Sequence, residues 1–238
     1  TATNIEQELI FSDETIYVPG VSLVQRDRDT DEIYLGYSSP KTPSRVYRFN
    51  LSNKSKMLVK EQEIPSGHNP ENYIVERVEF KSHDGRLVPL TITRHKKTKT
   101  DGSANLLLYG YGSYGNSMSP SFSSTRLSLI DRDIIWATAH IRGGMEKGMK
   151  WWKEGKLTNK KNTFEDYIHA GKYLIKNNYT SKGKIIGMGG SAGGLLMGAV
   201  VNQSPELFLG IIMAVPFVDS LTTNLDHSLP LTVGEFDE

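Results

Sequence analysis

The sequence predicts an α/β domain preceded by part of an antiparallel β domain, within a chain of 238 residues. Short runs with apolar residues at period two occupy the first 70 residues, separated by turn-forming residues. From residue 71 onward, strand patterns alternate with helix patterns, which is typical of a parallel sheet covered by helices. We therefore divide the chain into residues 1–70 and residues 71–238.

Composition narrows the function classes. Lys and Arg number 28 against 27 Asp and Glu, so the net charge of the chain is too small to favour nucleic acid or an anionic membrane as a partner. The sequence has no cysteine, which excludes disulfides, a cysteine nucleophile and thiolate metal sites. The start lacks the pattern of a signal peptide, and apolar stretches such as 207–218 are too short to span a bilayer. We expect a soluble, cytoplasmic protein that needs no metal or organic cofactor.

The first segment contains four predicted strands before a Pro- and Gly-containing linker near residues 65–71. Their β-branched and aromatic residues alternate with polar ones, as in antiparallel strands. Four strands amount to one blade of a β-propeller or to one small sheet. The strands are expected at residues 15–18, 32–37, 45–51 and 56–59.

The second segment opens with a predicted hairpin, residues 73–81 and 87–95, around an Asp-Gly turn. Further strands are expected at residues 105–109, 134–139, 184–188 and 209–215, and helices at 123–131, 162–177 and 192–202. The helix at 162–177 carries one apolar face at spacings of three and four residues, formed by Phe164, Tyr167, Ile168, Gly171, Leu174 and Ile175.

One serine lies at a glycine-rich bend between a strand and a helix. Gly189-Gly-Ser-Ala-Gly matches G-x-S-x-G, a motif whose strained turn raises a nucleophilic serine above the sheet. The N–H of Ala192, at the start of the helix, would then donate to a developing oxyanion. The alternative is a tight turn or a phosphate-binding turn, although the lysine of a phosphate loop is missing. We favour Ser191 as a nucleophile.

Two further glycine clusters follow strands at the same predicted edge of the sheet. The residues Tyr109-Gly-Tyr-Gly-Ser-Tyr-Gly follow the strand at 105–109, where enzymes of this kind carry a second oxyanion donor. The residues Ile141-Arg-Gly-Gly follow the strand at 134–139, at the edge where open α/β sheets bind ligands. Arg142 is thus a candidate for substrate binding, with an internal ion pair as the alternative.

These motifs, in this order, resemble the prolyl oligopeptidase family of serine peptidases, and within it the oligopeptidase B (protease II) type. The resemblance extends to the helix start Asn162-Thr-Phe-Glu-Asp-Tyr and to Val215-Pro-Phe-Val-Asp, and it covers nearly the whole chain. It implies an α/β-hydrolase fold preceded by the last part of a seven-bladed β-propeller. It also implies cleavage of short peptides after Arg or Lys through an acyl-enzyme.

The resemblance assigns roles by position. Ser191 corresponds to the nucleophile, the Tyr111 hydroxyl and the Ala192 N–H to the oxyanion donors, and Glu235 with Asp237 to the carboxylates that receive a basic side chain. A guanidinium suits a bidentate carboxylate in a dry pocket, although these two residues could simply belong to an acidic chain end.

Two departures from the family pattern stand out. Met145 replaces a usual glycine, which suggests a reshaped loop. Ser119-Pro-Ser has hydroxyls where acidic residues are common, so a preference for paired basic residues is not expected.

The sequence after Ser191 contains few candidates for a catalytic base and acid. A serine hydroxyl needs a histidine that takes its proton and a carboxylate that orients the histidine, in the chain order Ser, acid, His. Only His227 follows Ser191, and Asp219 could serve as its acid, but His227 precedes any further strand. We expect base and acid to lie outside this chain, which would be an interior fragment of a longer oligopeptidase, with a C-terminal part bound in trans as one alternative.

Two other classes of function stay open. One is a prolyl oligopeptidase or an esterase of the same fold. The other is a non-catalytic remnant or interaction module that keeps the serine turn without a triad.

Overall fold

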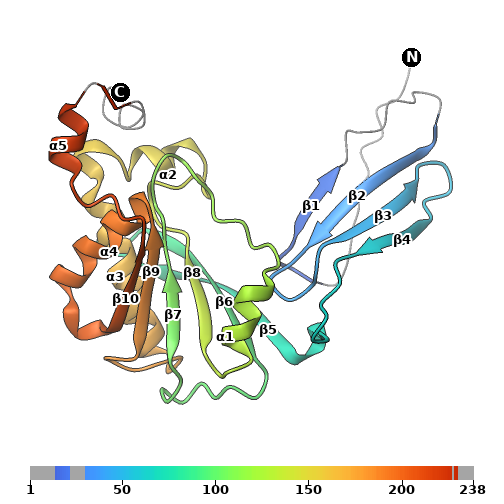
Figure 1. Cartoon of the computed structure of the whole chain (residues 1–238), viewed down its shortest axis with the longest axis horizontal. Helices are drawn as coiled ribbons and strands as arrows, with labels where there is room; N and C mark the ends of the chain where they lie inside the picture. Colours follow the sequence, from blue (N-terminus) through green and yellow to red (C-terminus); the bar gives the residue numbers. More distant parts are fainter. Residues whose placement is uncertain (1–13, 22–29, 227, 230–238) are drawn as a thin grey trace. The chain divides into compact units, whose positions relative to one another are not determined.

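The computed structural model describes residues 14–21, 30–226 and 228–229, and it is drawn in Figure 1. The described residues form two compact units. The first unit holds the residues up to Pro70 together with Ser119–Ser124, and the second holds Glu71–Met118 and the residues from Thr125 onward.

The first unit contains a four-stranded antiparallel sheet in the order β1-β2-β3-β4. Leu35, Tyr37 and Phe49 supply its buried apolar side chains. The predicted strands are present, with one shift: the first begins at Val18 rather than at Thr15, because Val18–Val21 are the residues that pair with β2. The strands are β1 (Val18–Val21), β2 (Glu32–Ser38), β3 (Arg45–Asn50) and β4 (Lys56–Glu61).

The second unit contains a six-stranded sheet in the order β10-β9-β7-β8-β6-β5. Four neighbouring strands run parallel, whereas β5 and β6 form the predicted antiparallel hairpin. The strands are β5 (Tyr73–Lys81), β6 (Leu87–His95), β7 (Leu106–Tyr109), β8 (Ile135–Ala139), β9 (Ile185–Gly190) and β10 (Phe208–Ala214). All six strands predicted for this segment are confirmed to within two residues.

The helices of the second unit include the three that the sequence predicts. These are α1 (Ser124–Ile130), α3 (Lys161–Lys176) and α4 (Ala192–Gln203). Shorter helical segments are η1 (Pro70–Asn72), α2 (Met149–Lys153), η2 (Leu157–Asn159), η3 (Pro205–Leu207) and α5 (Ser220–Leu225). The predicted apolar face of α3 is confirmed, since its residues are buried or packed against the core.

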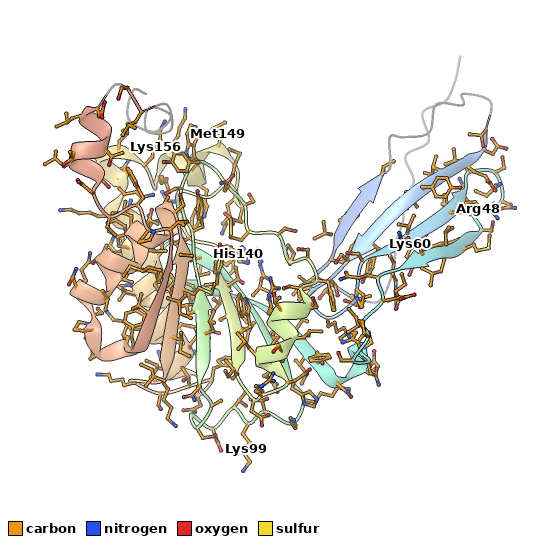
Figure 2. The ribbon with its side chains drawn as sticks, viewed as in Figure 1. Arg48, Lys60, Lys99, His140, Met149 and Lys156 are labelled. Carbon is orange, nitrogen blue, oxygen red and sulfur yellow. The ribbon has the colours of Figure 1, made fainter. Side chains whose placement is uncertain are left out.

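The core lies between the sheet and the helices α3 and α4. Buried side chains of β6, β7, β8 and β9 meet those of both helices in one apolar cluster, which includes Leu90, Leu108 and Leu174. On the other face of the sheet, the guanidinium of Arg126 on α1 lies 5.0 Å from the ring of Trp136 on β8. Because β7, β8, β9 and β10 are parallel, the loops that follow them gather at the carboxyl ends of these strands. In Figure 2, Met149 and Lys156 lie toward these carboxyl ends and Lys99 lies at the opposite ends of the strands.

Candidate active site

The turn at Ser191 joins β9 to α4 and holds the serine in an unusual backbone conformation. Its φ of 54° and ψ of −117° lie outside the regions that residues with a Cβ normally occupy. The Ser191 N–H donates to the carbonyl of Ala214 at 2.9 Å, and the Ser191 carbonyl accepts from Phe217 N–H at 3.0 Å and Gly194 N–H at 2.8 Å. The conformation is therefore held by hydrogen bonds with the end of β10, with the segment that follows it and with the first turn of α4. The serine residue is exposed.

Close backbone approaches explain three of the glycines around Ser191. A Cβ on Gly189 would lie 2.2 Å from the Gly193 carbonyl oxygen, and one on Gly194 would lie 2.5 Å from Pro216 Cα. A Cβ on Gly193 would lie 2.9 Å from the carbonyl oxygen of Gly110. The glycines let β9, α4 and the neighbouring loops meet without a side chain between them.

The loop of residues 110–116, called the Tyr111 loop below, lies against the start of α4. A Cβ on Gly193 would come within 3.4 Å of both Cα and Cδ2 of Tyr111. Two donor-bearing residues named by the sequence, Tyr111 and Ala192, therefore lie beside the Ser191 turn. In the described part of the chain, the Ala192 N–H donates to no backbone carbonyl, so it remains available at the helix N-terminus.

Arg142 lies in the interior, with 1 % of its side chain exposed. Its Nε and Nη2 donate to the two oxygens of Asp166 at 2.8 and 2.6 Å, and its Nη1 donates to Asp84 at 2.6 Å. Ser82 donates from its hydroxyl to Asp166 as well. Arg142 thus forms an internal ion pair, which is the alternative to substrate binding, and it joins the β5–β6 turn to α3.

Burial and pairing act in opposite directions on this cluster. Burial by itself would lower the pKa of Arg142, but hydrogen bonds to Asp166 and Asp84 raise it. Burial would raise the pKa of Asp84, but the hydrogen bond from Arg142 lowers it. Both groups are therefore held in their charged forms.

The segment that follows Arg142 supports the Tyr111 loop. A Cβ on Gly143 would lie 2.0 Å from the carbonyl oxygen of Gly112, and the N–H of Gly115 donates to the Gly143 carbonyl at 3.0 Å. The Met145 methyl lies against Gly115, where a Cβ would come within 2.7 Å of it. Met145, which departs from the family pattern, thus packs beneath the Tyr111 loop.

The described histidines contact groups other than Ser191. His140, labelled in Figure 2, is buried and its Nε2 lies 2.6 Å from Arg77 Nη1 and 2.8 Å from Thr91 Oγ1. Hydrogen-bond contacts of the other described histidines are His68 Nε2 with the Lys41 carbonyl at 2.6 Å, His95 Nδ1 with Lys97 N–H at 3.1 Å, His169 Nδ1 with the Glu165 carbonyl at 2.8 Å, and His83 Nδ1 with Ser82 Oγ at 3.3 Å.

The remaining candidates fall near the end of the chain. His227, Glu235 and Asp237 lie outside the described residues. Asp219 caps α5, where its side chain accepts from the Thr222 N–H at 3.1 Å. That capping bond is compatible with a structural role, and Asp219 keeps no described contact with Ser191.

The described residues contain neither a side-chain cluster suited to a metal ion nor a helix suited to a membrane. No group of three or more His, Asp or Glu side chains is arranged to hold a metal ion there. None of the helices described has the length and apolar character needed to cross a bilayer.

Comparison with known proteins places the chain in a family. The prolyl oligopeptidase family matches residues 120–238. "Dipeptidyl aminopeptidase BI" of Pseudoxanthomonas mexicana is 44 % identical over 97 % of this chain and 32 % of the relative, and "Protease 2" of Moraxella lacunata is 42 % identical over 98 % and 34 %. The structure of oligopeptidase B from Leishmania major superposes with a TM-score of 0.87 at 40 % identity, over 95 % of this chain and 32 % of that one.

The chain belongs to the prolyl oligopeptidase family, whose members are serine-type peptidases and hence hydrolases. Its relatives include proteins named as oligopeptidase B, protease 2 and prolyl endopeptidase. The chain spans about a third of the length of these relatives, with 32 % and 34 % covered in the two quoted above.

Several residues around the site were not singled out from the sequence. Asp84 and Asp166 hold Arg142, and Lys160 contacts the Tyr111 loop. Asp84 belongs to an Asp-Gly turn, and Asp166 belongs to a motif that resembles the family. Neither local pattern indicates that both carboxylates bind the same arginine.

Proposed function

We propose that this chain is the part of a serine oligopeptidase that carries the nucleophile, Ser191. The observation that supports this most is the backbone of Ser191, which is held at positive φ on a strand-to-helix turn beside Tyr111 and Ala192. Such strain is retained where the surrounding structure imposes it, and it is concentrated at functional sites.

In the proposed reaction, the Ser191 hydroxyl attacks the carbonyl carbon of a peptide and its proton passes to a histidine. The oxyanion that forms accepts hydrogen bonds from the Ala192 N–H and the Tyr111 hydroxyl, and an acyl-enzyme and a free amine result. Water then hydrolyses the acyl-enzyme. The proposed base and acid lie outside the described residues, because the described histidines contact other groups. A C-terminal part, in the same polypeptide or in trans, is the proposed source.

For Arg142 we propose a positioning role instead of substrate contact. Its guanidinium is buried and already engaged by two carboxylates, and the segment after it supports the Tyr111 loop. A substrate would have to displace Asp84 or Asp166 to reach it.

The proposed architecture extends this reading to the whole chain. Residues 1–70 are the end of a β-propeller, and residues 71–238 are the N-terminal and central part of an α/β-hydrolase domain. A four-stranded antiparallel sheet followed by a mostly parallel one fits this proposal. The cytoplasm is the proposed location, since a chain without cysteine suits a reducing compartment.

Labelling with a fluorophosphonate tests the nucleophile. We expect the protein that includes the proposed C-terminal part to react and its Ser191→Ala variant to lose the label, because the probe forms its bond with an activated serine. A label that persists in Ser191→Ala would contradict the assignment. Parallel labelling of His227→Ala separates the sources of the base: unchanged labelling places the base elsewhere, and loss of the label would implicate His227.

The proposed specificity is cleavage after Arg or Lys, with Glu235 and Asp237 as the carboxylates that bind the basic side chain. We expect Glu235→Gln to lower kcat/KM for an Arg substrate by about 10- to 100-fold, since a charge-assisted bidentate contact is lost. Hydrolysis of a simple ester should change much less.

Rates of hydrolysis of an Arg substrate, a Pro substrate and a simple ester decide between the alternative activities. Prolyl endopeptidases are among the relatives at 35 % identity, so Pro cleavage is the competing outcome. Arg cleavage that survives Glu235→Gln unchanged would remove the proposed specificity site, and binding without any Ser191-dependent chemistry would favour a non-catalytic module.

A further inference from the structure

The Tyr111 loop has few backbone hydrogen bonds of its own. Gly110 N–H donates to the Met188 carbonyl at 3.1 Å, and Gly115 N–H donates to the Gly143 carbonyl at 3.0 Å. Within the loop, the Asn116 N–H donates to the Ser113 carbonyl at 3.0 Å. Between these two anchors, the N–H groups of Tyr111, Gly112 and Ser113 make no backbone hydrogen bond in the described part of the chain. The stretch that carries the Tyr111 side chain therefore needs anchoring from another element.

Lys160 supplies such an anchor. Its ammonium donates to the Gly112 carbonyl at 2.6 Å and to the Ser113 hydroxyl at 2.5 Å. Both acceptors belong to buried residues that follow directly after Tyr111. Hydrogen bonds from a charged donor are stronger than neutral ones, and their loss would leave two buried acceptors without this partner.

The lysine is itself well fixed, because it lies between two helical segments. The Lys160 N–H donates to the Leu157 carbonyl at 3.0 Å, and its carbonyl accepts from the Thr163 N–H at 3.0 Å. Lys160 also directly precedes α3, whose Asp166 holds Arg142. The ammonium is thus carried by a residue that is fixed at the start of α3, the helix that also contains Asp166.

Packing restricts the same stretch from the other side. A Cβ on Gly112, which has a φ of 68°, would lie 2.4 Å from Thr163 Cγ2 and 2.9 Å from the Ile141 side chain. Packing alone limits movement toward α3, whereas the Lys160 ammonium opposes movement away from it. The two together define one position for the residue next to Tyr111.

We propose that Lys160 is a positioning residue that holds the Tyr111 loop so that the Tyr111 hydroxyl meets the oxyanion. This inference rests on the proposed function, because it assigns Lys160 a part in the same acyl transfer. Lys160 touches neither the substrate nor the reacting atoms. It acts through the backbone of Gly112 and the side chain of Ser113.

A double-mutant comparison tests the inference on the intact protein, with the Arg, Pro or ester substrate that it hydrolyses. The proteins are the parent, Lys160→Met, Tyr111→Phe and the double variant. We expect Lys160→Met to lower kcat by about 10- to 100-fold with KM within about threefold, since a misplaced oxyanion donor affects only the transition state. In the Tyr111→Phe background the further loss should be under about threefold, because the hydroxyl that Lys160 positions is absent.

Lys161→Met is the matched control. Lys161 is the next residue, begins α3 and is exposed, so its substitution removes the same charge without touching the Tyr111 loop. Its kcat should stay within about twofold of the parent. An equal loss of kcat from Lys160→Met in both backgrounds, or no loss in either, would overturn the inference.

Amide hydrogen exchange adds a readout that is independent of activity. We expect Lys160→Met to speed exchange at Gly115 and Asn116, and Lys161→Met to leave it unchanged. Unchanged exchange in Lys160→Met would refute the anchoring role. A parent without Ser191-dependent hydrolysis would instead overturn the proposed function, while exchange still decides whether Lys160 holds the loop. Should Lys160→Met fail to fold, Lys160→Gln, which keeps an N–H donor, replaces it.

Discussion

At the scale of single residues, the site depends on backbone positions that tolerate no side chain. Gly189 and Gly193 approach each other so closely that Ser191 is forced into its turn, and Gly193 also meets the Tyr111 loop. Ser191 and the proposed oxyanion donors, Tyr111 and Ala192, therefore lie close together because the glycines between them carry no side chain. The motif G-x-S-x-G records this requirement, since each of its glycines meets a neighbouring backbone.

Two adjacent glycines offer a test with a built-in control. We expect Gly189→Ala to destabilise the fold by about 1–3 kcal/mol or more, because the added methyl would lie 2.2 Å from the Gly193 carbonyl oxygen. Gly190→Ala should cost less than about 1 kcal/mol, since the added methyl would meet Ala214 at ordinary contact distances of 3.4 and 3.6 Å. Urea unfolding of both variants measures the difference, and similar losses would contradict the assigned packing.

At the scale of elements, polar side chains connect the hairpin to the parallel part of the sheet. Arg77 on β5 and Thr91 on β6 both reach the ring of His140, which follows β8. On the other side of the ring, Nδ1 of His140 lies 3.4 Å from Glu146, whose other contact is the Met118 N–H at 2.8 Å. A buried histidine thus joins the hairpin to the segment that follows the Tyr111 loop.

This arrangement predicts a pH dependence of stability. Burial is the main cause that lowers the pKa of His140, with the charge of Arg77 acting in the same direction, while Glu146 opposes them. The unfolded chain therefore takes up a proton below about pH 6.5 before the folded protein does, and the free energy of unfolding falls as pH decreases through that range, by at most about 1.4 kcal/mol per pH unit.

The His140→Gln variant checks this expectation. It should lose less free energy of unfolding between pH 7.5 and pH 5.5 than the parent, since the group that stays neutral on folding is gone. Urea titrations at the two pH values supply the comparison. Equal losses in parent and variant would show that other groups carry the dependence.

At the scale of the whole molecule, the described sheet has an apolar edge. In the described part of the chain β10 pairs with β9 alone, and Leu209, Ile212 and Met213 are 60 %, 44 % and 43 % exposed. Strand edges of this kind pair readily with other chains. The exposed apolar residues of β10 therefore make this edge a candidate surface for association.

Self-association of the 238-residue chain should therefore depend on this edge. We expect sedimentation velocity to show larger species as concentration rises, and Met213→Lys to reduce them, because a charge on an edge strand opposes pairing. Leu87→Lys is the matched control, since Leu87 is 44 % exposed on β6, at a distance in sequence and sheet order from β10. Equal association in parent and Met213→Lys would exclude β10 as the contact.

Most of the elements could be predicted from the sequence because local patterns specify them. Period-two runs, the spacing of apolar residues on α3 and the glycines around Ser191 are all properties of neighbouring residues. The first strand begins three residues later than its pattern predicts, because its limits depend on pairing with β2 rather than on its own residues. The grouping of Ser119–Ser124 with the first unit likewise follows from contacts between distant segments.

The sequence by itself determined the α/β pattern, the strand-to-helix turn at Ser191 and the family. The tertiary structure decided which residues share partners: Arg142 with Asp84 and Asp166, Lys160 with Gly112, and Tyr111 with the first turn of α4. The physical reason is the separation of the interacting residues along the sequence. Turns and helices are specified by residues a few positions apart, whereas an ion pair joins residues 24 or 58 positions apart only after the sheet and its helices have packed.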